Sequence, residues 1–211
     1  MPNANRSLSW VVGLSLFPLA VVLLSGCQCC KTPAAADKSA TAAKPAAVVA
    51  APVVPAAPAM PRATLRINAG LSSSVTDSEG NVWLADQGFA DGETIERPDL
   101  QIANTKNPVI YRSERYSMTA YSWAVPNGKY VVKLHFAETY DGITAPGERV
   151  FSFSVEGHEF KNFDVWAKAG GTLRAYVETV NVDVTDGKLD ITFTPQVQNP
   201  QINGIEIIPA A

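Results

Sequence analysis

From residue 63 to the end the chain contains no cysteine, so this part forms no disulfide and no cysteine-ligated zinc site. Its only histidines, His135 and His158, are 23 residues apart and have no cysteine partner there, so we expect no metal. The sequence also lacks a Walker loop, a GxGxxG turn and an HExxH helix, and we therefore expect no nucleotide or other cofactor.

Basic charge is scarce in the same part of the chain. Residues 63–211 carry 12 Lys and Arg against 19 Asp and Glu, a net charge of −7. Binding to a phosphate backbone requires clustered Lys and Arg. This composition therefore predicts that nucleic acid is not a partner.

The sequence has one long apolar run, residues 10–24, which follows Arg6 and precedes Ser25-Gly26-Cys27. This run is interrupted by Pro18 and is shorter than the ~20 apolar residues of a membrane span, so it indicates a secretory signal. An ordinary signal peptide or a signal anchor is the simpler interpretation.

Leu24-Ser-Gly-Cys27 resembles a bacterial lipobox, in which cleavage precedes the cysteine and its thiol is acylated. We therefore predict a lipoprotein signal peptide at 1–26 and a lipid anchor on Cys27 that holds the protein at a membrane. By resemblance to Gram-negative lipoproteins, Gln28 favours the outer membrane. The expected location is the cell envelope, facing the periplasm or in the outer membrane.

Residues 27–62 are predicted to be a disordered tether. Positions 31–62 hold 13 Ala and 6 Pro, with no Gly and no aromatic residue. The prolines interrupt any alanine helix, and the segment has too little apolar bulk to fold. Such a spacer separates an anchored terminus from a folded domain at 63–211.

Residues 63–211 alternate apolar and polar side chains with a period of two. The pattern is clear in 130–136, 151–155, 180–184 and 189–193, and turn sequences such as Asn127-Gly128, Glu156-Gly157 and Asp186-Gly187 separate these stretches. Many short strands of this kind, without an amphipathic helix, predict an all-β, antiparallel β-sandwich of the jelly-roll type. The alternation changes phase within 173–184, which predicts a bulge or turn near Glu178-Thr179.

Two further patterns have a structural and a functional interpretation. Asp77-Ser-Glu79-Gly-Asn81 has oxygen ligands at alternate positions and could bind Ca²⁺, but it lacks the closing acidic residue of an EF-hand and reads better as a hairpin turn. Glu114, Glu138 and Asp141 are candidates for a glycosidase carboxylate pair, yet any chain with 19 acids offers such pairs. No serine, histidine and aspartate arrangement is evident, so we predict that the protein is not an enzyme.

Aromatic residues gather in two nearby segments, at positions 111, 116, 121, 123 and 140. In Tyr111-Arg-Ser-Glu-Arg-Tyr116 the rings alternate with guanidinium and carboxylate groups. Sugar rings stack their apolar C–H faces on aromatic side chains while polar groups bind their hydroxyls. The simpler interpretation is that these tyrosines pack in the core or on a sheet.

The order of several segments resembles the malectin domain from about Ala63 to Pro209. They are Arg66-Ile-Asn-Ala-Gly70, Trp83-Leu-Ala-Asp86, Ile110-Tyr-Arg-Ser-Glu-Arg-Tyr116, Val131-Val-Lys-Leu-His-Phe-Ala-Glu-Thr-Tyr140, Val150-Phe-Ser-Phe, Glu156-Gly157 and Asn199-Pro-Gln-Ile-Asn-Gly-Ile-Glu-Ile207. The resemblance implies a β-sandwich related to galactose-binding-like modules, and glycan recognition without catalysis. In the founding animal lectin of the family the ligand is a glucose disaccharide.

The resemblance also implies site residues, which carry over one at a time. The sugar-stacking tyrosines fall on Tyr116 and Tyr140. The next aromatic position is Asp141 here, and the acidic residue before Asn-Pro is Gln198. A further ligand tyrosine has only Phe89 as a candidate. Asn68, Gly70, Asn203 and Gly204 read as residues that determine the fold.

Our sequence-based hypothesis is a carbohydrate-binding domain on a lipid-anchored stalk, with a partner oligo- or polysaccharide of the glucose or galactose type. The predicted carbohydrate-binding residues are Tyr111, Tyr116, Glu138, Tyr140, Asp141 and Gln198. An envelope module that binds protein or peptide, or a structural module on the same β-sandwich, is the alternative, since β-sandwiches host many functions. A hydrolase is the least favoured hypothesis.

Overall fold

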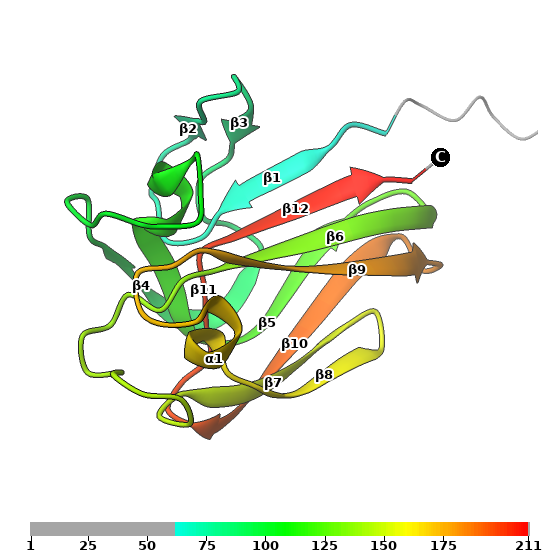
Figure 1. The fold of residues 1–211 in the computed structure, drawn as a ribbon. Coiled ribbons are helices and arrows are strands. Elements are labelled where there is room, and N and C mark those ends of the chain that lie inside the picture. The colour runs from blue at the N-terminus through cyan, green and yellow to red at the C-terminus, as the bar shows by residue number, and fades with distance from the viewer. Residues whose placement is uncertain (1–61, 211) are drawn as a thin grey trace, which may run out of the picture. The chain divides into compact units, whose positions relative to one another are not determined.

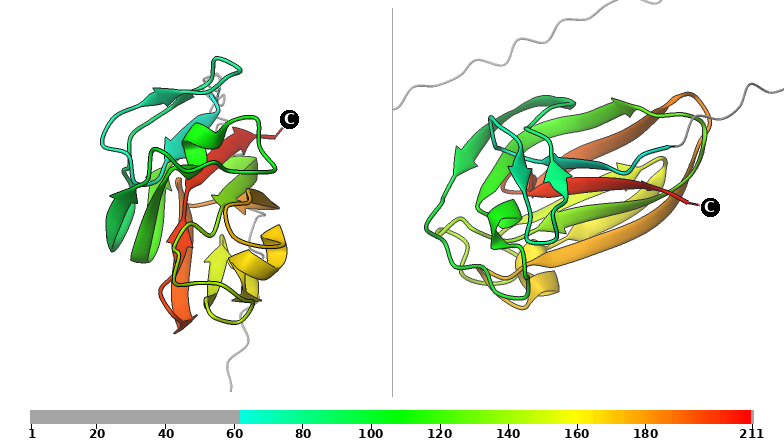
Figure 2. Two further views of the ribbon diagram at one scale, coloured as in Figure 1. Left: turned by 60° about the vertical axis from the view of Figure 1, so that its left-hand side comes forward. Right: turned by 90° about the horizontal axis from the view of Figure 1, so that it is seen from above.

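The computed structural model describes residues 62–210, and the predicted signal peptide, Cys27 and almost all of the predicted tether lie outside them. The described part consists almost entirely of antiparallel strands in two packed sheets and a short hairpin, as Figures 1 and 2 show. The predicted all-β antiparallel sandwich is therefore confirmed. Within residues 62–210 no helix has the length and apolar character needed to cross a membrane.

The first sheet has four strands in the order β1-β12-β6-β9, and all its pairs are antiparallel. Its strands are β1 (Leu65–Asn68), β6 (Gly128–Phe136), β9 (Tyr176–Val184) and β12 (Gly204–Pro209). The first and last strands of the domain thus lie side by side, as the right-hand view of Figure 2 shows.

The second sheet has six strands, and β5 is its hub because it pairs with β4, β10 and β11. From β10 the sheet continues through β7 to β8. Its strands are β4 (Phe89–Glu96), β5 (Ser113–Ala124), β7 (Val150–Val155), β8 (His158–Phe163), β10 (Lys188–Val197) and β11 (Gln201–Ile202). Outside the two sheets lie the hairpin of β2 (Val75–Thr76) and β3 (Val82–Trp83), a 3₁₀ turn η1 (Pro108–Tyr111) and one short helix, α1 (Val165–Ala169).

The core lies between the two sheets and follows from the alternation in the sequence. Val132, Leu134 and Phe136 of β6 face Phe151 and Phe153 of β7, and all five are buried. The phenyl rings of Phe136, Phe151, Phe153 and Phe163 lie within contact distance of one another. Burial of this apolar surface is the main force that holds the sheets together.

The prediction of a bulge or turn near Glu178-Thr179 is wrong. Strand β9 pairs with β6 from Tyr176 to Val184 without a register shift. The side chains of Val180 and Val182 face the core, whereas that of Val177 points outward and is 38% exposed. Because Val177 is apolar but exposed, the alternation of apolar residues in the sequence changes phase although the strand is regular.

Buried asparagine and glycine residues join the sheets at one end, as the sequence predicts. Asn203 Oδ1 accepts the Ala137 N–H over 2.7 Å, and its Nδ2 donates to the Ser113 carbonyl over 2.7 Å. Asn68 Nδ2 donates to the carbonyl of Ile110 over 3.0 Å. Gly70 has φ +100° and touches the Glu114 backbone so closely that a β-carbon would lie 2.7 Å from it, so only glycine fits there.

The segment Asp77–Asn81 is the hairpin turn between β2 and β3, which confirms the structural interpretation of its sequence. The Asp77 carboxylate accepts hydrogen bonds from the Glu79 and Asn81 backbone N–H groups and from Trp83 Nε1. It thus ties the hairpin to the buried indole. Residues 62–210 contain no group of three or more His, Cys, Asp or Glu side chains arranged to hold a metal ion.

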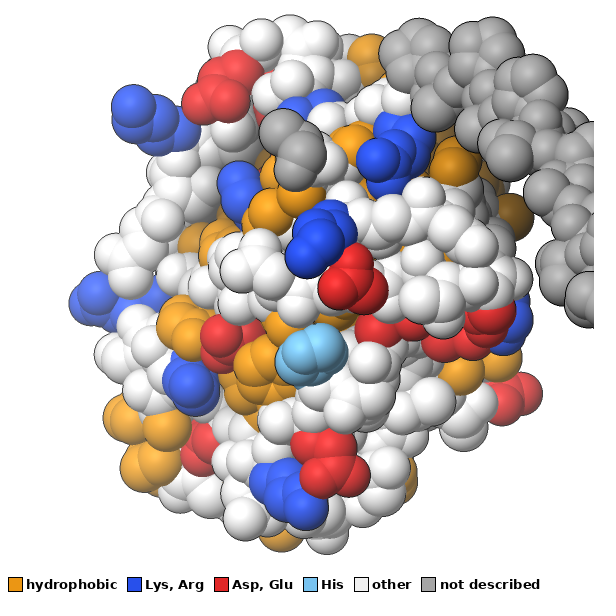
Figure 3. All heavy atoms as spheres, turned by 90° about the vertical axis from the view of Figure 1, so that its right-hand side faces the viewer, with side chains coloured by type: hydrophobic (Ala, Val, Ile, Leu, Met, Phe, Trp, Pro, Cys, Tyr) orange, Lys and Arg blue, Asp and Glu red, His pale blue; other side chains and the backbone are white. Residues whose placement is uncertain are grey.

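The two ends of β6 belong to opposite ends of the sandwich. At its start, Arg62 donates to the Asn127 carbonyl and the Ala210 N–H donates to the Lys129 carbonyl, so both termini of the described chain lie here. Figure 1 shows this end at the right of the view. Nine residues at ~3.3 Å per residue separate it by roughly 26 Å from the loop that follows Phe136. Figure 3 faces the end with the termini, where both acidic and basic side chains lie on the surface.

Candidate functional site

A pocket of about 270 Å³ opens at the end of the sandwich away from the termini. It lies where β4 and β5 meet the loop between β6 and β7 and the link between β10 and β11. Segments from four parts of the chain thus converge on it. Its lining residues are Ile95, Arg97, Glu114, Tyr116, Tyr140, Arg149, Gln198 and Asn199.

Tyr116 is the fourth residue of β5 and forms part of the pocket wall. Its backbone pairs with Glu93 of β4 on one side and with Gln201 of β11 on the other, which fixes its position. The Tyr116 hydroxyl donates to Glu93 Oε2 over 2.7 Å. This hydrogen bond is the main cause that raises the pKa of Tyr116, with a smaller contribution from desolvation. The ring is therefore neutral and oriented at physiological pH.

Tyr140 is the exposed aromatic residue of the pocket, with 44% of its surface accessible. It begins a turn in the loop after β6, closed by the Ile143 N–H donating to the Tyr140 carbonyl over 3.2 Å. A large aromatic side chain loses favourable burial when it stays in water. An exposed ring at the mouth of a pocket is typical of a ligand-binding surface.

Beneath the pocket, Arg97, Glu114 and Thr139 form a closed set of polar contacts. Arg97 Nη1 lies 3.1 Å from Glu114 Oε1 and donates to Thr139 Oγ1 over 3.0 Å. The Thr139 hydroxyl donates to Glu114 Oε2 over 2.6 Å. Glu114 is nearly buried, so its charge is compensated by the guanidinium rather than by water.

A second buried ion pair joins two loops of the site. Arg149 Nε donates to Glu138 Oε2 over 2.7 Å, and Arg149 Nη1 donates to the Asn199 carbonyl over 2.6 Å. Glu138 Oε1 also accepts the Tyr140 N–H over 3.1 Å. Burial raises the pKa of Glu138, and Arg149 together with the Tyr140 N–H opposes that shift. The pair thus fixes the Tyr140 loop relative to the link that carries Asn199.

Gln198 reaches the pocket from a strained backbone. Its φ is +60°, in the left-handed region that residues other than glycine seldom occupy. It lies between the end of β10 and the start of β11 and lines the pocket beside Asn199. Its side-chain amide offers both a donor and an acceptor to a ligand, and strain of this kind is common at binding sites.

Three of the six predicted binding residues, Tyr116, Tyr140 and Gln198, line this pocket together. Asp141 is exposed on the same turn as Tyr140 but does not line the pocket. Glu138 has no exposed surface, so it supports the site through Arg149 and the Tyr140 backbone and cannot bind a sugar hydroxyl directly.

Two aromatic expectations need correction. Tyr111 lies in a separate buried cluster, with its hydroxyl 2.9 Å from His135 Nδ1, and burial raises its pKa. Phe89 packs against Tyr121, with ring centroids 4.9 Å apart, and carries the Arg115 guanidinium over its ring. Both residues are therefore packing residues outside the pocket, and Ile95 supplies the apolar wall on β4 instead.

Sequence reasoning missed Ile95, Arg97, Arg149 and Asn199. Arg97 and Arg149 come just after β4 and just before β7, and nothing in their local sequence distinguishes them from surface arginines. The available signal was the glutamate next to each tyrosine of the pocket, Glu114 near Tyr116 and Glu138 near Tyr140. Buried carboxylates such as Glu114 and Glu138 require positively charged partners.

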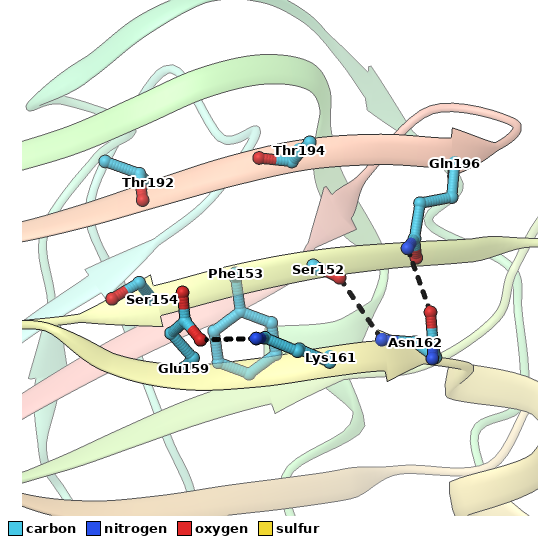
Figure 4. A pocket seen from close by; sticks show the side chains of 9 residues that line it. All are labelled: Ser152, Phe153, Ser154, Glu159, Lys161, Asn162, Thr192, Thr194 and Gln196. Carbon is cyan, nitrogen blue, oxygen red and sulfur yellow. Dashed lines mark hydrogen bonds and ion pairs between the residues drawn. The ribbon is translucent and has the colours of Figure 1, made fainter.

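A second hollow, of about 320 Å³, lies over β7, β8 and β10 (Figure 4). Its side chains are mainly hydroxyls and amides, and several bind one another, as in the hydrogen bond from Gln196 Nε2 to Asn162 Oδ1 over 2.9 Å. Lys161 and Glu159 form an exposed ion pair beside it. Phe153 belongs to the core, so this hollow has no exposed ring for a ligand.

The family model described as "Malectin domain" matches residues 63–206. Among curated proteins, the receptor-like protein kinase FERONIA of Arabidopsis thaliana is 28% identical over 152 residues, 65% of this chain and 17% of FERONIA. Receptor-like protein 4 of the same plant is 37% identical over 84 residues, 39% of this chain and 13% of that protein. The chain thus spans less than a fifth of the curated relatives it matches.

Solved structures show the same fold. A crystal structure of Bacteroides uniformis β-glucuronidase matches with a TM-score of 0.64 and 22% identity over 71% of this chain and 18% of that enzyme. The crystal structure of the plant receptor-like kinase FER matches with a TM-score of 0.61 and 20% identity, over 69% of this chain and 48% of that chain. At these identities the matches support the architecture alone. The family model covers most of the chain and the strands form the expected sandwich, so the chain belongs to the malectin domain family.

Proposed function

We propose that this domain binds a neutral glycan, without catalysis, in the pocket between Tyr140 and Tyr116. The observation that carries the proposal is the exposed Tyr140 ring at the mouth of a pocket that combines apolar and polar side chains. The C–H face of a pyranose would stack on this ring. Membership of the malectin family supports the same function.

Polar groups near the Tyr140 and Tyr116 rings are suited to binding sugar hydroxyls. The Gln198 amide can donate and accept, and Glu93, which already accepts the Tyr116 hydroxyl, keeps further acceptor capacity. Ile95, 37% exposed, adds an apolar surface to the lining. This combination of two tyrosine rings, one aliphatic side chain and a few polar groups matches the amphipathic surface of a sugar.

Charge favours a neutral sugar over an acidic one. Arg97 and Arg149 are each paired with a buried carboxylate, Glu114 and Glu138 respectively. Glu93 adds a further carboxylate next to Tyr116. An anionic sugar would therefore have to compete for guanidinium groups that are already neutralised and would meet repulsion from Glu93.

The same pairing argues against hydrolysis at this pocket. General acid and nucleophile must both reach the scissile glycosidic bond. Glu138 has no exposed surface, and Glu114 is held by Arg97 and Thr139. Neither is free to approach a substrate, so we propose a binding role.

We further propose that the domain stands on a lipid anchor at Cys27, in the cell envelope. The lipobox-like Leu24-Ser-Gly-Cys27 and the Pro-rich stretch before Arg62 support this arrangement. The described chain begins at the end of the sandwich opposite the pocket. A glycan would then be bound at the end of the sandwich away from Arg62, where the described chain begins.

A peptide or protein partner is a second candidate. One solved relative is described as the plant peptide RALF23 in complex with FER and LLG2, and this chain matches it with a TM-score of 0.60. The exposed Ile95 and Val197 beside the pocket would suit such a partner.

The test is a glycan array with the full-length protein in detergent, wild type beside Tyr140→Ala. We expect the wild type to bind neutral glycans selectively and the variant to lose that signal with an unchanged melting temperature. A blank array from folded wild-type protein would reject glycan binding and favour a peptide partner.

A further inference from the structure

The ring of Tyr140 rests on Gly142, two residues further along the same turn. A β-carbon placed on Gly142 would lie 2.5 Å from Tyr140 Cε1, 2.6 Å from Cζ and 2.9 Å from Oη. Because Oη is nearer to that point than the remaining ring atoms are, the point lies beside the Cε1–Cζ edge of the ring. The phenol end of Tyr140 is therefore packed against its own turn.

The backbone itself does not require glycine at this position. Gly142 is absent from the residues with positive φ, so an L-residue can adopt its conformation without strain. Gly92 is a useful contrast, because its φ is +80° and a β-carbon there would lie 2.4 Å from the Tyr116 carbonyl oxygen. The three atoms nearest to a β-carbon at Gly142 belong to the movable end of Tyr140, whereas those nearest to one at Gly92 belong to backbone.

The rest of the turn is fixed on both sides of the ring. Glu138 accepts the Tyr140 N–H, and Ile143, which is 2% exposed, anchors the other side in the interior. The turn is closed by the hydrogen bond from Ile143 to Tyr140. With the backbone held in this way, the space left by Gly142 decides where the ring lies.

We propose that Gly142 is a positioning residue that leaves room for the phenol end of Tyr140 against the turn and so sets the orientation in which the ring meets a sugar. The ligand role rests on the proposed function. The ring is then set in its binding orientation before the ligand arrives, which lowers the entropy cost of binding.

The test is a double-mutant cycle on the full-length protein in detergent, with maltose and lactose as glucose-type and galactose-type probes. Titration calorimetry gives the affinity of the wild type, Gly142→Ala, Tyr140→Ala and the double variant. We expect Gly142→Ala to weaken binding about 3- to 10-fold, the range of one aromatic stacking contact. In the Tyr140→Ala background the same substitution should change nothing further, since coupled residues are not additive.

A ligand-free measurement separates this proposal from the proposed function. Ring signals of isotope-labelled tyrosines in NMR spectra, with the Tyr140 signal identified by its loss in Tyr140→Ala, report where the ring lies. We expect this signal to move in Gly142→Ala while the melting temperature stays within a few degrees.

The outcomes divide cleanly between the two proposals. Wild-type protein that binds no sugar overturns the proposed function and with it the ligand role of the ring. An unmoved Tyr140 signal, or full affinity in Gly142→Ala, overturns the positioning role while leaving sugar binding intact. Loss of the folded state in Gly142→Ala would also overturn it, because the glycine would then serve the turn and not the ring.

Discussion

Arg149 and Glu138 lie 11 residues apart in the sequence, and their side chains meet over 2.7 Å beneath the pocket. Through this pair the Tyr140 backbone and the Asn199 carbonyl are attached to one point. Two loops that belong to different parts of the sheet are thereby held in a fixed relation. The pair contributes to the shape of the site although Glu138 itself is inaccessible to ligand.

We predict that Arg149→Met destabilises the domain by about 3–5 kcal/mol, because it leaves the Glu138 carboxylate buried without its partner. Urea denaturation followed by circular dichroism measures this change in the free energy of unfolding. Lys161→Met is the matched control, since its ion pair with Glu159 is exposed to solvent and contributes little to stability. Equal effects of the two substitutions would show that the buried pair does not hold the loops.

We predict that Asp77 makes stability depend on pH in the acidic range. Burial alone would raise the pKa of this carboxyl, but hydrogen bonds from Trp83, Asn81 and the turn backbone outweigh burial and lower it to about 2 from 3.8. A lowered folded-state pKa adds stability that is complete above the unfolded value, near pH 4, and is lost as the pH falls toward 2.

The measurement is urea denaturation of the wild type and Asp77→Asn at pH 5 and at pH 2.5. The advantage of the wild type should be about 2 kcal/mol at pH 5, from the difference between the two pKa values, and smaller at pH 2.5. An advantage that stays constant over this range would contradict the role of the ionised carboxylate.

The fold was predictable because each strand carries its own signal. Alternation along β6, β7 and β10 matches the buried and exposed positions, since one face of each strand packs in the core. Val177 led to the wrong prediction of a bulge, because an exposed valine is common on a sheet. Only the pairing of β9 with β6 shows that its side chain points outward.

The site was only partly predictable, because a pocket depends on loops that meet in space. Tyr116, Tyr140 and Gln198 were found from the resemblance to a family. Arg97 and Arg149 act through carboxylates 17 and 11 residues away, at Glu114 and Glu138, and no local pattern encodes such pairs. Tyr111 carried the same aromatic signal as Tyr116, yet the 3₁₀ turn η1 directs it to His135.

Arg62 offers a test of the separation between the two ends of the sandwich. Its guanidinium lies 5.3 Å from the centroid of the Tyr130 ring and donates to the Asn127 carbonyl. We predict that Arg62→Ala lowers the free energy of unfolding by about 1 kcal/mol or less, the range for an exposed cation–π contact. Glycan affinity should stay unchanged, because the pocket lies at the other end of β6. Weaker sugar binding in a calorimetric titration of this variant would contradict the location of the site.

The last prediction concerns Asp141, where the resemblance implies an aromatic residue. The side chain is exposed on the Tyr140 turn, so a larger ring can be accommodated there without disturbing the core. A second stacking ring is worth about 0.5–1.5 kcal/mol, so Asp141→Phe should tighten maltose binding by roughly 2- to 10-fold. Asp141→Leu removes the same charge without adding a ring, and it should leave the affinity near that of the wild type. An equal gain from leucine in the same titration would mean that charge, and not stacking, limits binding at this turn.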